Sequence, residues 1–170
     1  MVLIFNARDT QTLHAMNNDQ VIDILEQTKE RFLENEVSLL ASDANERSLT
    51  HKFAEHMQTI IGREWSIDCE YNRFGSDPKK IDELKRIVGE NTTTYETKPR
   101  TVYPDIIVHR RGEQGPNLLV VEAKKDATAK ERELDIAKLK VIQSTYNYSF
   151  AVFIDFKIKF KDIEMSFIEV

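Results

Sequence analysis

A chain of 170 residues with 41% hydrophobic composition is long enough for one domain with a hydrophobic core and too short for two such domains. Its net charge of −5 excludes the uniformly basic surface that is typical of tight, metal-free nucleic-acid binders. A single cysteine and the lack of any stretch near the ~18 apolar residues of a membrane span predict a soluble, cytoplasmic protein without disulfides.

Two amphipathic helices are predicted before the first strand, whereas residues 6–18 show no clear period. Residues 19–36 carry apolar side chains at helical spacing. The second helix begins near Asp43, an N-cap acid with Glu46 three residues later, and its apolar stripe consists of Leu49, Phe53, Met57 and Ile60. At about 100° per residue, Glu46 falls within this stripe and Glu55 on the opposite side. Glu46 is therefore either a capping-box residue or a member of a buried polar site.

Residues 64–73 alternate between apolar and polar side chains, which predicts a strand that is half buried. Cys69 is expected to face the core, and Asp68 to lie on a solvated face. The following interval, residues 75–103, lacks a β pattern. A helix is expected there from Ser76 to Val88, followed by a polar, threonine-rich segment. This interval is either an insertion that borders a substrate cleft or a solvated excursion.

The two most apolar β runs, residues 106–108 and 118–121, are separated by turn-forming residues and predict a hairpin. Asp105 opens the first run, while Glu122 and Lys124 end the second. Carboxylates at the edge of an apolar sheet require a cation, hydrogen bonds or protonation. Side-chain alternation places two apolar residues on the same face as Glu122 and Lys124, namely Leu118 and Val120.

After the hairpin, residues 126–147 are predicted to form a helix whose apolar side includes Leu139, Ile142 and Tyr146. Asp135 interrupts this side, and its spacing from Lys138 allows a local ion pair. Strands are expected at residues 149–154, 156–160 and 163–168. The element order predicts an α/β domain with a central mixed sheet flanked by helices.

The sequence Pro104-Asp105, followed by Glu122-Ala123-Lys124, resembles the signature of the PD-(D/E)xK nuclease superfamily. This resemblance implies a restriction-endonuclease-like core over about residues 46–156, with an insertion over about 75–103, in a single domain of residues 1–170. The N-terminal helix and the C-terminal strands would be additions to that core.

The resemblance implies that Asp105, Glu122 and Lys124 are catalytic. Asp105 and Glu122, with Glu46 and the carbonyl of Ala123, would hold Mg²⁺ or Mn²⁺ through oxygen ligands. Nearby carboxylates favour the charged form of Lys124, so we expect it to orient water and neutralise charge rather than act as a general base. The candidates for substrate binding are the cationic or polar residues Lys98, Arg100, Arg110, Lys138 and Gln143.

The implied function is Mg²⁺-dependent hydrolysis of phosphodiester bonds in nucleic acid, with DNA as the expected partner. Two alternatives remain open. One is a catalytically silent domain that binds nucleic acid, and the other is a protein-interaction domain in which the same residues form a salt-bridge cluster. The sequence also leaves open a homodimer or a partner subunit.

Overall fold

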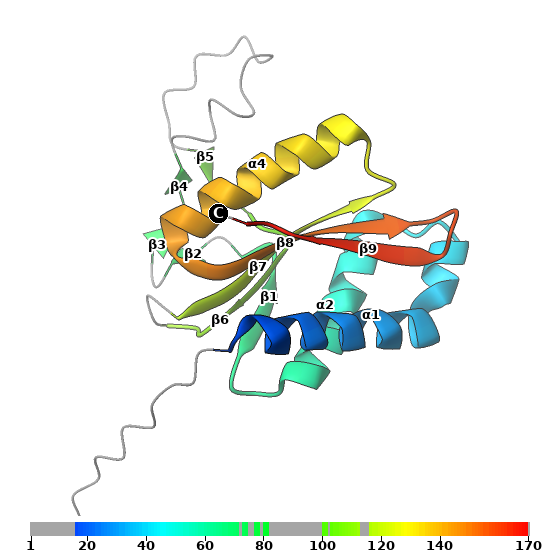
Figure 1. Cartoon of the computed structure of the whole chain (residues 1–170), viewed down its shortest axis with the longest axis horizontal. Helices are drawn as coiled ribbons and strands as arrows, with labels where there is room; N and C mark the ends of the chain where they lie inside the picture. Colours follow the sequence, from blue (N-terminus) through cyan, green and yellow to red (C-terminus); the bar gives the residue numbers. More distant parts are fainter. Residues whose placement is uncertain are drawn as a thin grey trace, which may run out of the picture.

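The computed structural model of the chain describes residues 16–71, 73–74, 77–78, 80–81, 100–101, 103–112 and 116–169. The main elements, drawn in Figure 1, are α1 (Asn18–Ala41), α2 (Glu46–Ile61), β1 (Ser66–Cys69), β6 (Ile106–His109), β7 (Asn117–Lys125), α4 (Ala129–Tyr146), β8 (Tyr148–Lys157) and β9 (Asp162–Phe167). Two small ladders pair β2 (Arg73–Phe74) with β3 (Asp77–Pro78), and β4 (Lys80–Ile81) with β5 (Arg100–Thr101).

Five strands form one sheet in the order β1-β6-β7-β8-β9. Neighbouring strands are antiparallel except for β7 and β8, which are parallel. A parallel pair requires a crossover connection, and the 18-residue helix α4 provides it. Figure 1 shows α4 on one face of the sheet and α1 and α2 on the other. The predicted α/β class, with a mixed sheet flanked by helices, is confirmed.

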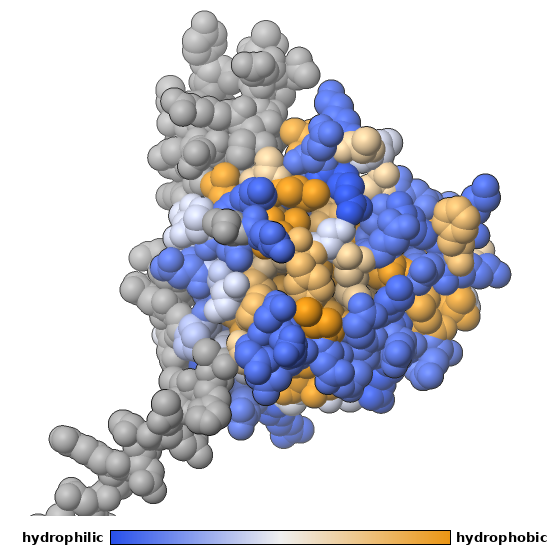
Figure 2. All heavy atoms as spheres, in the orientation of Figure 1, coloured by the Kyte–Doolittle hydropathy of each residue, from blue (hydrophilic) through white to orange (hydrophobic). Residues whose placement is uncertain are grey.

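The alternation of strand side chains divides the core into two layers. On one face, Phe32 and Phe53 of the first two helices pack with Phe156 of β8, and the ring centroids of Phe32 and Phe156 are 5.7 Å apart. On the other face, Leu139 of α4 packs in the same cluster as Phe153. In Figure 2 apolar residues gather in the middle of the view, between the hydrophilic surfaces of α4 and α1. Burial of these apolar surfaces is the main favourable contribution to folding.

Helix α2 starts differently from the prediction. Its N-cap is Asn45, whose side chain accepts a hydrogen bond from the Ser48 N–H at 2.9 Å. Asp43 is therefore not the N-cap, and of the two alternatives for Glu46 the capping box with Asp43 is wrong. Asp43 has a positive φ of 54° before the helix, and its carboxylate accepts a hydrogen bond from Lys125 Nζ at 2.8 Å. The Glu46 side chain is therefore released from local capping and reaches the sheet.

The hairpin of β6 and β7 is confirmed, but it contains an irregularity. Val108 pairs with Leu119 and His109 pairs with Asn117, so Leu118 is an extra residue in β7. Leu118 consequently packs with the layer of α1 and α2, whereas Val120 packs with the layer of α4. The prediction that both residues share a face with Glu122 is wrong for Leu118, because alternation restarts after a bulge.

Several other sequence-based expectations need correction. Cys69, expected in the core, is exposed at the end of β1, which stops before the predicted strand does. Residues 77–78 and 80–81 are strands rather than the start of a helix, and the rest of that predicted helix lies outside the described residues. Strands predicted at residues 149–154 and 156–160 are one continuous strand, β8, that ends at Lys157. In the described residues, no helix is long and apolar enough to cross a membrane.

The outer edge of β1 is hydrogen-bonded by a side chain of α2. The Gln58 amide accepts from the Ile67 N–H at 3.0 Å and donates to the Trp65 carbonyl at 3.1 Å. It also donates to the Gly62 carbonyl at 2.6 Å, which ties the end of the helix to the strand. One amide group thus forms with β1 the two hydrogen bonds that a neighbouring strand would form.

Candidate active site

The candidate site lies where β7 extends beyond the start of β6. The last residue pair between these strands is Ile106 with Val121. The next N–H of β7 that needs a partner on this side belongs to Ala123, and it donates to Asp105 Oδ2 at 2.8 Å. The Asp105 carboxylate therefore accepts the hydrogen bond that a backbone carbonyl of β6 would otherwise accept from β7. Burial raises the pKa of Asp105, while this hydrogen bond and the nearby lysines act in the opposite direction.

Glu122 is the most deeply buried acid of the site. Its side chain is 2% exposed, and its Oε2 accepts from Lys138 Nζ of α4 at 2.6 Å. Within the described part of the chain, its Oε1 is buried and has no hydrogen-bond partner. Burial raises the pKa of Glu122 to about 8; Lys138 lowers it and Asp105 raises it. A buried carboxylate oxygen without a hydrogen-bond partner is energetically unfavourable and needs an explanation.

Lys124 lies between two carboxylates that come from helices on opposite faces of the sheet. Its Nζ donates to Glu46 Oε1 at 3.2 Å and lies 3.7 Å from Asp135 Oδ2 of α4. Burial alone would lower the pKa of Lys124, but Asp135 and Glu46 outweigh it and raise the pKa. The amine is therefore a fixed cation at neutral pH.

Glu46 and Glu55 lie on different sides of α2, as their helical spacing predicted. Both oxygens of Glu46 face β7, since Oε2 accepts from the Lys125 N–H at 3.2 Å while Oε1 accepts from Lys124. Glu55 is exposed and pairs with Lys52 at 2.7 Å. Glu46 is thus a member of the polar site, and its nearest partners are lysine amine and backbone N–H groups rather than other carboxylates.

Helix α4 contributes two oppositely charged side chains. The i, i+3 spacing suggested that Asp135 and Lys138 could pair with each other. Instead, each meets the opposite charge on β7, because Asp135 pairs with Lys124 and Lys138 pairs with Glu122. The capping box of Thr128 with Glu131 fixes the start of the helix. Gln143, a predicted substrate contact, lies in the last turn of the helix and donates instead to the Ser149 carbonyl at 3.4 Å.

Of the remaining predicted substrate contacts, Arg110 does not lie at the site. Arg110 lies at the far end of β6 from Asp105, and its guanidinium stacks 5.3 Å from the centroid of the Trp65 ring. Lys98 lies outside the described residues, and Arg100 is described only by its backbone in β5. Arg110 is therefore not a phosphate contact next to Asp105.

The residues on either side of Arg110, His109 and Arg111, form a network with Asp68. Asp68 was predicted to lie on a solvated face. Asp68 accepts hydrogen bonds from His109 Nε2 at 2.8 Å and from Arg111 Nε at 2.8 Å, and its side chain is only 14% exposed. Burial alone would raise the pKa of Asp68, but the Arg111 and His109 partners outweigh it and lower the pKa. The prediction of a solvated Asp68 is wrong, since His109 at the end of β6 and Arg111 just after it both bond its carboxylate.

Sequence reasoning also missed Asp155, which follows the buried run of β8. This carboxylate is buried, pairs with Lys157, and accepts from the Ala127 N–H at 3.1 Å. It lies opposite Lys124 in the parallel register. Asp155 therefore holds the turn that carries the chain from the site into α4. An acid directly after a run of buried apolar residues was the available signal.

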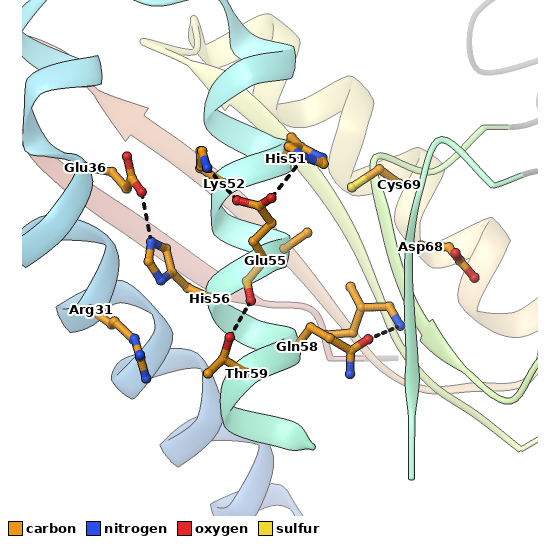
Figure 3. Close-up of a pocket in the computed structure, with 12 residues that line it drawn as sticks. Arg31, Glu36, His51, Lys52, Glu55, His56, Gln58, Thr59, Asp68 and Cys69 are labelled. Atoms are coloured by element: carbon orange, nitrogen blue, oxygen red, sulfur yellow. Dashed lines mark hydrogen bonds and ion pairs between the residues drawn. The ribbon is translucent and has the colours of Figure 1, made fainter. Parts of the chain in front are cut away.

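A cavity of about 610 Å³ opens beside the site between α2 and the β1 edge, and its walls include Asp105 and Glu46 together with Arg47 and His51. Figure 3 shows a second cavity, of about 750 Å³, between α1, α2 and β1. His51 and Cys69 line both cavities. The acids of the second cavity are paired, for example Glu36 with His56 at 3.3 Å. Of these two cavities, the one of about 610 Å³ is lined by acids of the site and the other is not.

The donor atoms of the site match the oxygen ligands that Mg²⁺ prefers. One buried oxygen of Glu122 has no hydrogen-bond partner among the residues that the structure describes, and Asp105 lies at the adjoining strand end. Within the described ranges, however, no three His, Cys, Asp or Glu side chains form a group that could hold a metal ion. Lysine amines lie among the carboxylates instead. Asp105 and Glu122 thus supply oxygen ligands of the type that a divalent cation prefers, but the described residues do not complete a three-ligand group.

Comparisons with protein-family models, with curated protein sequences and with solved structures find no match to this chain.

Proposed function

We propose that this protein is a nuclease that hydrolyses phosphodiester bonds of nucleic acid, with DNA as the expected substrate, in a reaction that depends on Mg²⁺ or Mn²⁺. The observation that carries the proposal is Glu122. An acid with 2% side-chain exposure is costly to keep charged in an apolar strand, and one of its buried oxygens has no hydrogen-bond partner among the described residues. That oxygen gains a partner if a cation binds there.

The order of the elements supports the same reading. From α2 through β1, the β6–β7 hairpin, α4 and β8, the chain follows helix, three strands, helix and strand. This order resembles the restriction-endonuclease-like core that the Asp105, Glu122 and Lys124 motif implies. The motif residues lie at the adjoining ends of two paired strands, which supports the proposal.

Asp105 and Glu122 would hold the cation. A divalent ion there would polarise the scissile phosphate and lower the pKa of a bound water. Glu46 would join them only by giving up its hydrogen bonds to Lys124 and Lys125. We therefore assign Glu46 first to the positioning of Lys124, and second to the cation. The carbonyl of Ala123 remains a further oxygen ligand in this proposal.

Lys124 acts as a fixed positive charge in this proposal. The carboxylates of Glu46 and Asp135 hold its amine from two sides and raise its pKa, so it is protonated at neutral pH. A protonated amine cannot accept the proton of the attacking water, but it stabilises negative charge that develops on the phosphate oxygens. Preorganised charges of this kind cost no reorganisation during the reaction.

The test is cleavage of circular, linear and single-stranded DNA, and of RNA, with Mg²⁺, with Mn²⁺ and with excess EDTA. We expect cleavage of at least one substrate only with a divalent ion, and its loss in Lys124→Ala. The matched control is Lys125→Ala, because the Lys125 amine pairs with Asp43. Full activity in EDTA, or equal activity of Lys124→Ala and the control, would refute the proposal.

A further inference from the structure

The two outer strands of the sheet, β1 and β9, differ in how their free edges are protected. On β1, the Gln58 amide occupies the Trp65 carbonyl and the Ile67 N–H. On β9, the residues Asp162–Phe167 include neither lysine nor proline, which edge strands commonly use to prevent pairing. β9 crosses the middle of the view in Figures 1 and 2, where apolar residues gather between α4 and α1. The β9 edge is therefore the more open of the two.

The backbone groups of alternate residues of β9 point away from the sheet. The Ile168 N–H donates to a carbonyl of β8 at 2.9 Å. Because such groups alternate along an antiparallel strand, those of Ile163, Met165 and Phe167 point outward. The Ile163 N–H donates to Asp162 Oδ1 at 2.8 Å. In the part of the chain that the structure describes, the N–H and C=O groups of Met165 and Phe167 have no partner, so they form a template for one further strand.

The side chains of β9 give its two faces different characters. Met165 packs with the layer of α1 and α2, and Phe167, which alternation places on the same face, is 36% exposed. On the face of α4, Glu164 is exposed, and Arg132 of the helix donates to the Ser166 hydroxyl. The edge thus presents an apolar stripe on one face, and an acid near a fixed arginine on the other.

We propose that β9 pairs antiparallel with β9 of a second copy of this chain, about a two-fold axis at Met165, so that the two five-stranded sheets become one. Met165 then lies opposite Met165 of the second copy, and Ile163 lies opposite Phe167. These cross-strand pairs cover the exposed Phe167 ring with apolar side chains on the face of α1 and α2. The outward N–H and C=O groups of Met165 bond those of its counterpart.

Charge complementarity favours this register over its neighbours. Glu164 lies opposite Ser166 of the second copy, so Arg132 of that copy, which bonds Ser166, comes within reach of the Glu164 carboxylate. The two-fold axis makes this contact twice. A register centred on Glu164 would place this acid opposite itself, and one centred on Ile163 would place it opposite Asp162. Like charges directly opposite each other on paired strands are destabilising.

The test is sedimentation velocity of the full chain as a function of protein concentration, where wild type should form a dimer. Glu164→Lys should weaken the dimer about tenfold, because repulsion from Arg132 arises at two symmetric positions. Glu64→Lys is the matched control, since Glu64 is exposed beside the opposite edge of the sheet and the change in net charge is identical. Met165→Pro should abolish the dimer and keep the pairing with β8, because the N–H that it removes points outward.

A charge exchange beyond the strand ends tests the register itself. In the proposed dimer Lys161 lies opposite Glu169 of the second copy, and both side chains are exposed. Lys161→Glu should weaken the dimer, and the combination of Lys161→Glu with Glu169→Lys should restore it to within about twofold of wild type. A purely local effect of the first change would not be rescued by the second.

A wild-type chain that stays monomeric at every concentration, or equal dimerisation of Glu164→Lys and Glu64→Lys, would overturn the inference. A monomer whose Met165 N–H exchanges slowly with solvent would overturn it too, since another segment of the same chain would then cover the edge. None of the varied residues belongs to the candidate active site. The dimer and the nuclease function therefore stand or fail separately.

Discussion

Replacement of Glu122 by glutamine is expected to stabilise the metal-free protein by an amount that grows with pH. Burial raises the pKa of this carboxyl from 4.5 to about 8. The folded protein therefore binds the proton of Glu122 more tightly than the unfolded chain does. The stability that this proton contributes is complete below the unfolded pKa of 4.5 and is lost as the pH rises through 8. Glutamine is uncharged at every pH and avoids this loss.

The size of the effect follows from the shift in pKa. One pKa unit corresponds to about 1.4 kcal/mol of differential interaction. The wild-type protein should therefore lose about 2 kcal/mol between low pH and pH 6, and roughly 5 kcal/mol above pH 8, relative to the glutamine variant. Addition of Mn²⁺ should reverse the trend, because the cation binds the ionised carboxylate and its binding releases a proton.

Urea denaturation in EDTA at pH values from 5 to 9 measures this difference, with the fluorescence of Trp65, the only tryptophan, as the signal. Glu55→Gln is the control, since Glu55 is exposed and the hydrogen bond from Lys52 lowers its pKa. That variant should show no gain of stability at high pH. If the curves of wild type and Glu122→Gln stay parallel from pH 5 to 9, the burial argument for Glu122 is wrong.

Three further outcomes are expected. Asp135→Asn should lower kcat about tenfold, because Asp135 positions Lys124. KM and the calorimetric affinity for Mn²⁺ should stay unchanged, because Asp135 does not bind the cation. An unchanged kcat would exclude this positioning role. Glu46→Gln should lower the free energy of unfolding in EDTA by about 1 kcal/mol, whereas Glu55→Gln should not; urea denaturation that shows equal effects would contradict the contacts with β7. DNA affinity, measured by fluorescence anisotropy, should be weak in EDTA and should improve with Ca²⁺, since the acids of the site repel phosphate; tight binding in EDTA would contradict this.

The sequence predicted those parts of the fold that depend on local patterns. Apolar runs on either side of a turn predicted the β6–β7 hairpin, and helical spacing predicted α4 and the inward direction of Glu46. The positions of Asp105, Glu122 and Lys124 at adjoining strand ends followed from the hairpin alone. These features need only the period of a helix or a strand and the rules of turn chemistry.

Ion pairs between side chains that are far apart in the sequence could not be predicted in this way. Nothing in the local pattern showed that Asp135 and Lys138 would pair across to β7 rather than with each other, because that depends on how α4 lies on the sheet. The same limit applies to Glu46, which was expected to hold a cation together with Asp105 and Glu122 but contacts Lys124 instead. An extra residue at Leu118 also breaks the alternation on which face assignments rest.

The hydrogen bonds from Gln58 to the outer edge of β1 protect that edge from pairing with a strand of another molecule. An exposed strand edge is a template on which another chain can add a strand, and proteins commonly protect such edges with charge or irregularity. Here one neutral amide already occupies the Ile67 N–H and the Trp65 carbonyl. A strand from a second molecule would have to displace Gln58 before it could extend the sheet at these positions. Gln58→Ala should therefore increase self-association at high concentration, which analytical sedimentation would detect, whereas a variant that associates no more than wild type would show that the edge is protected by other means.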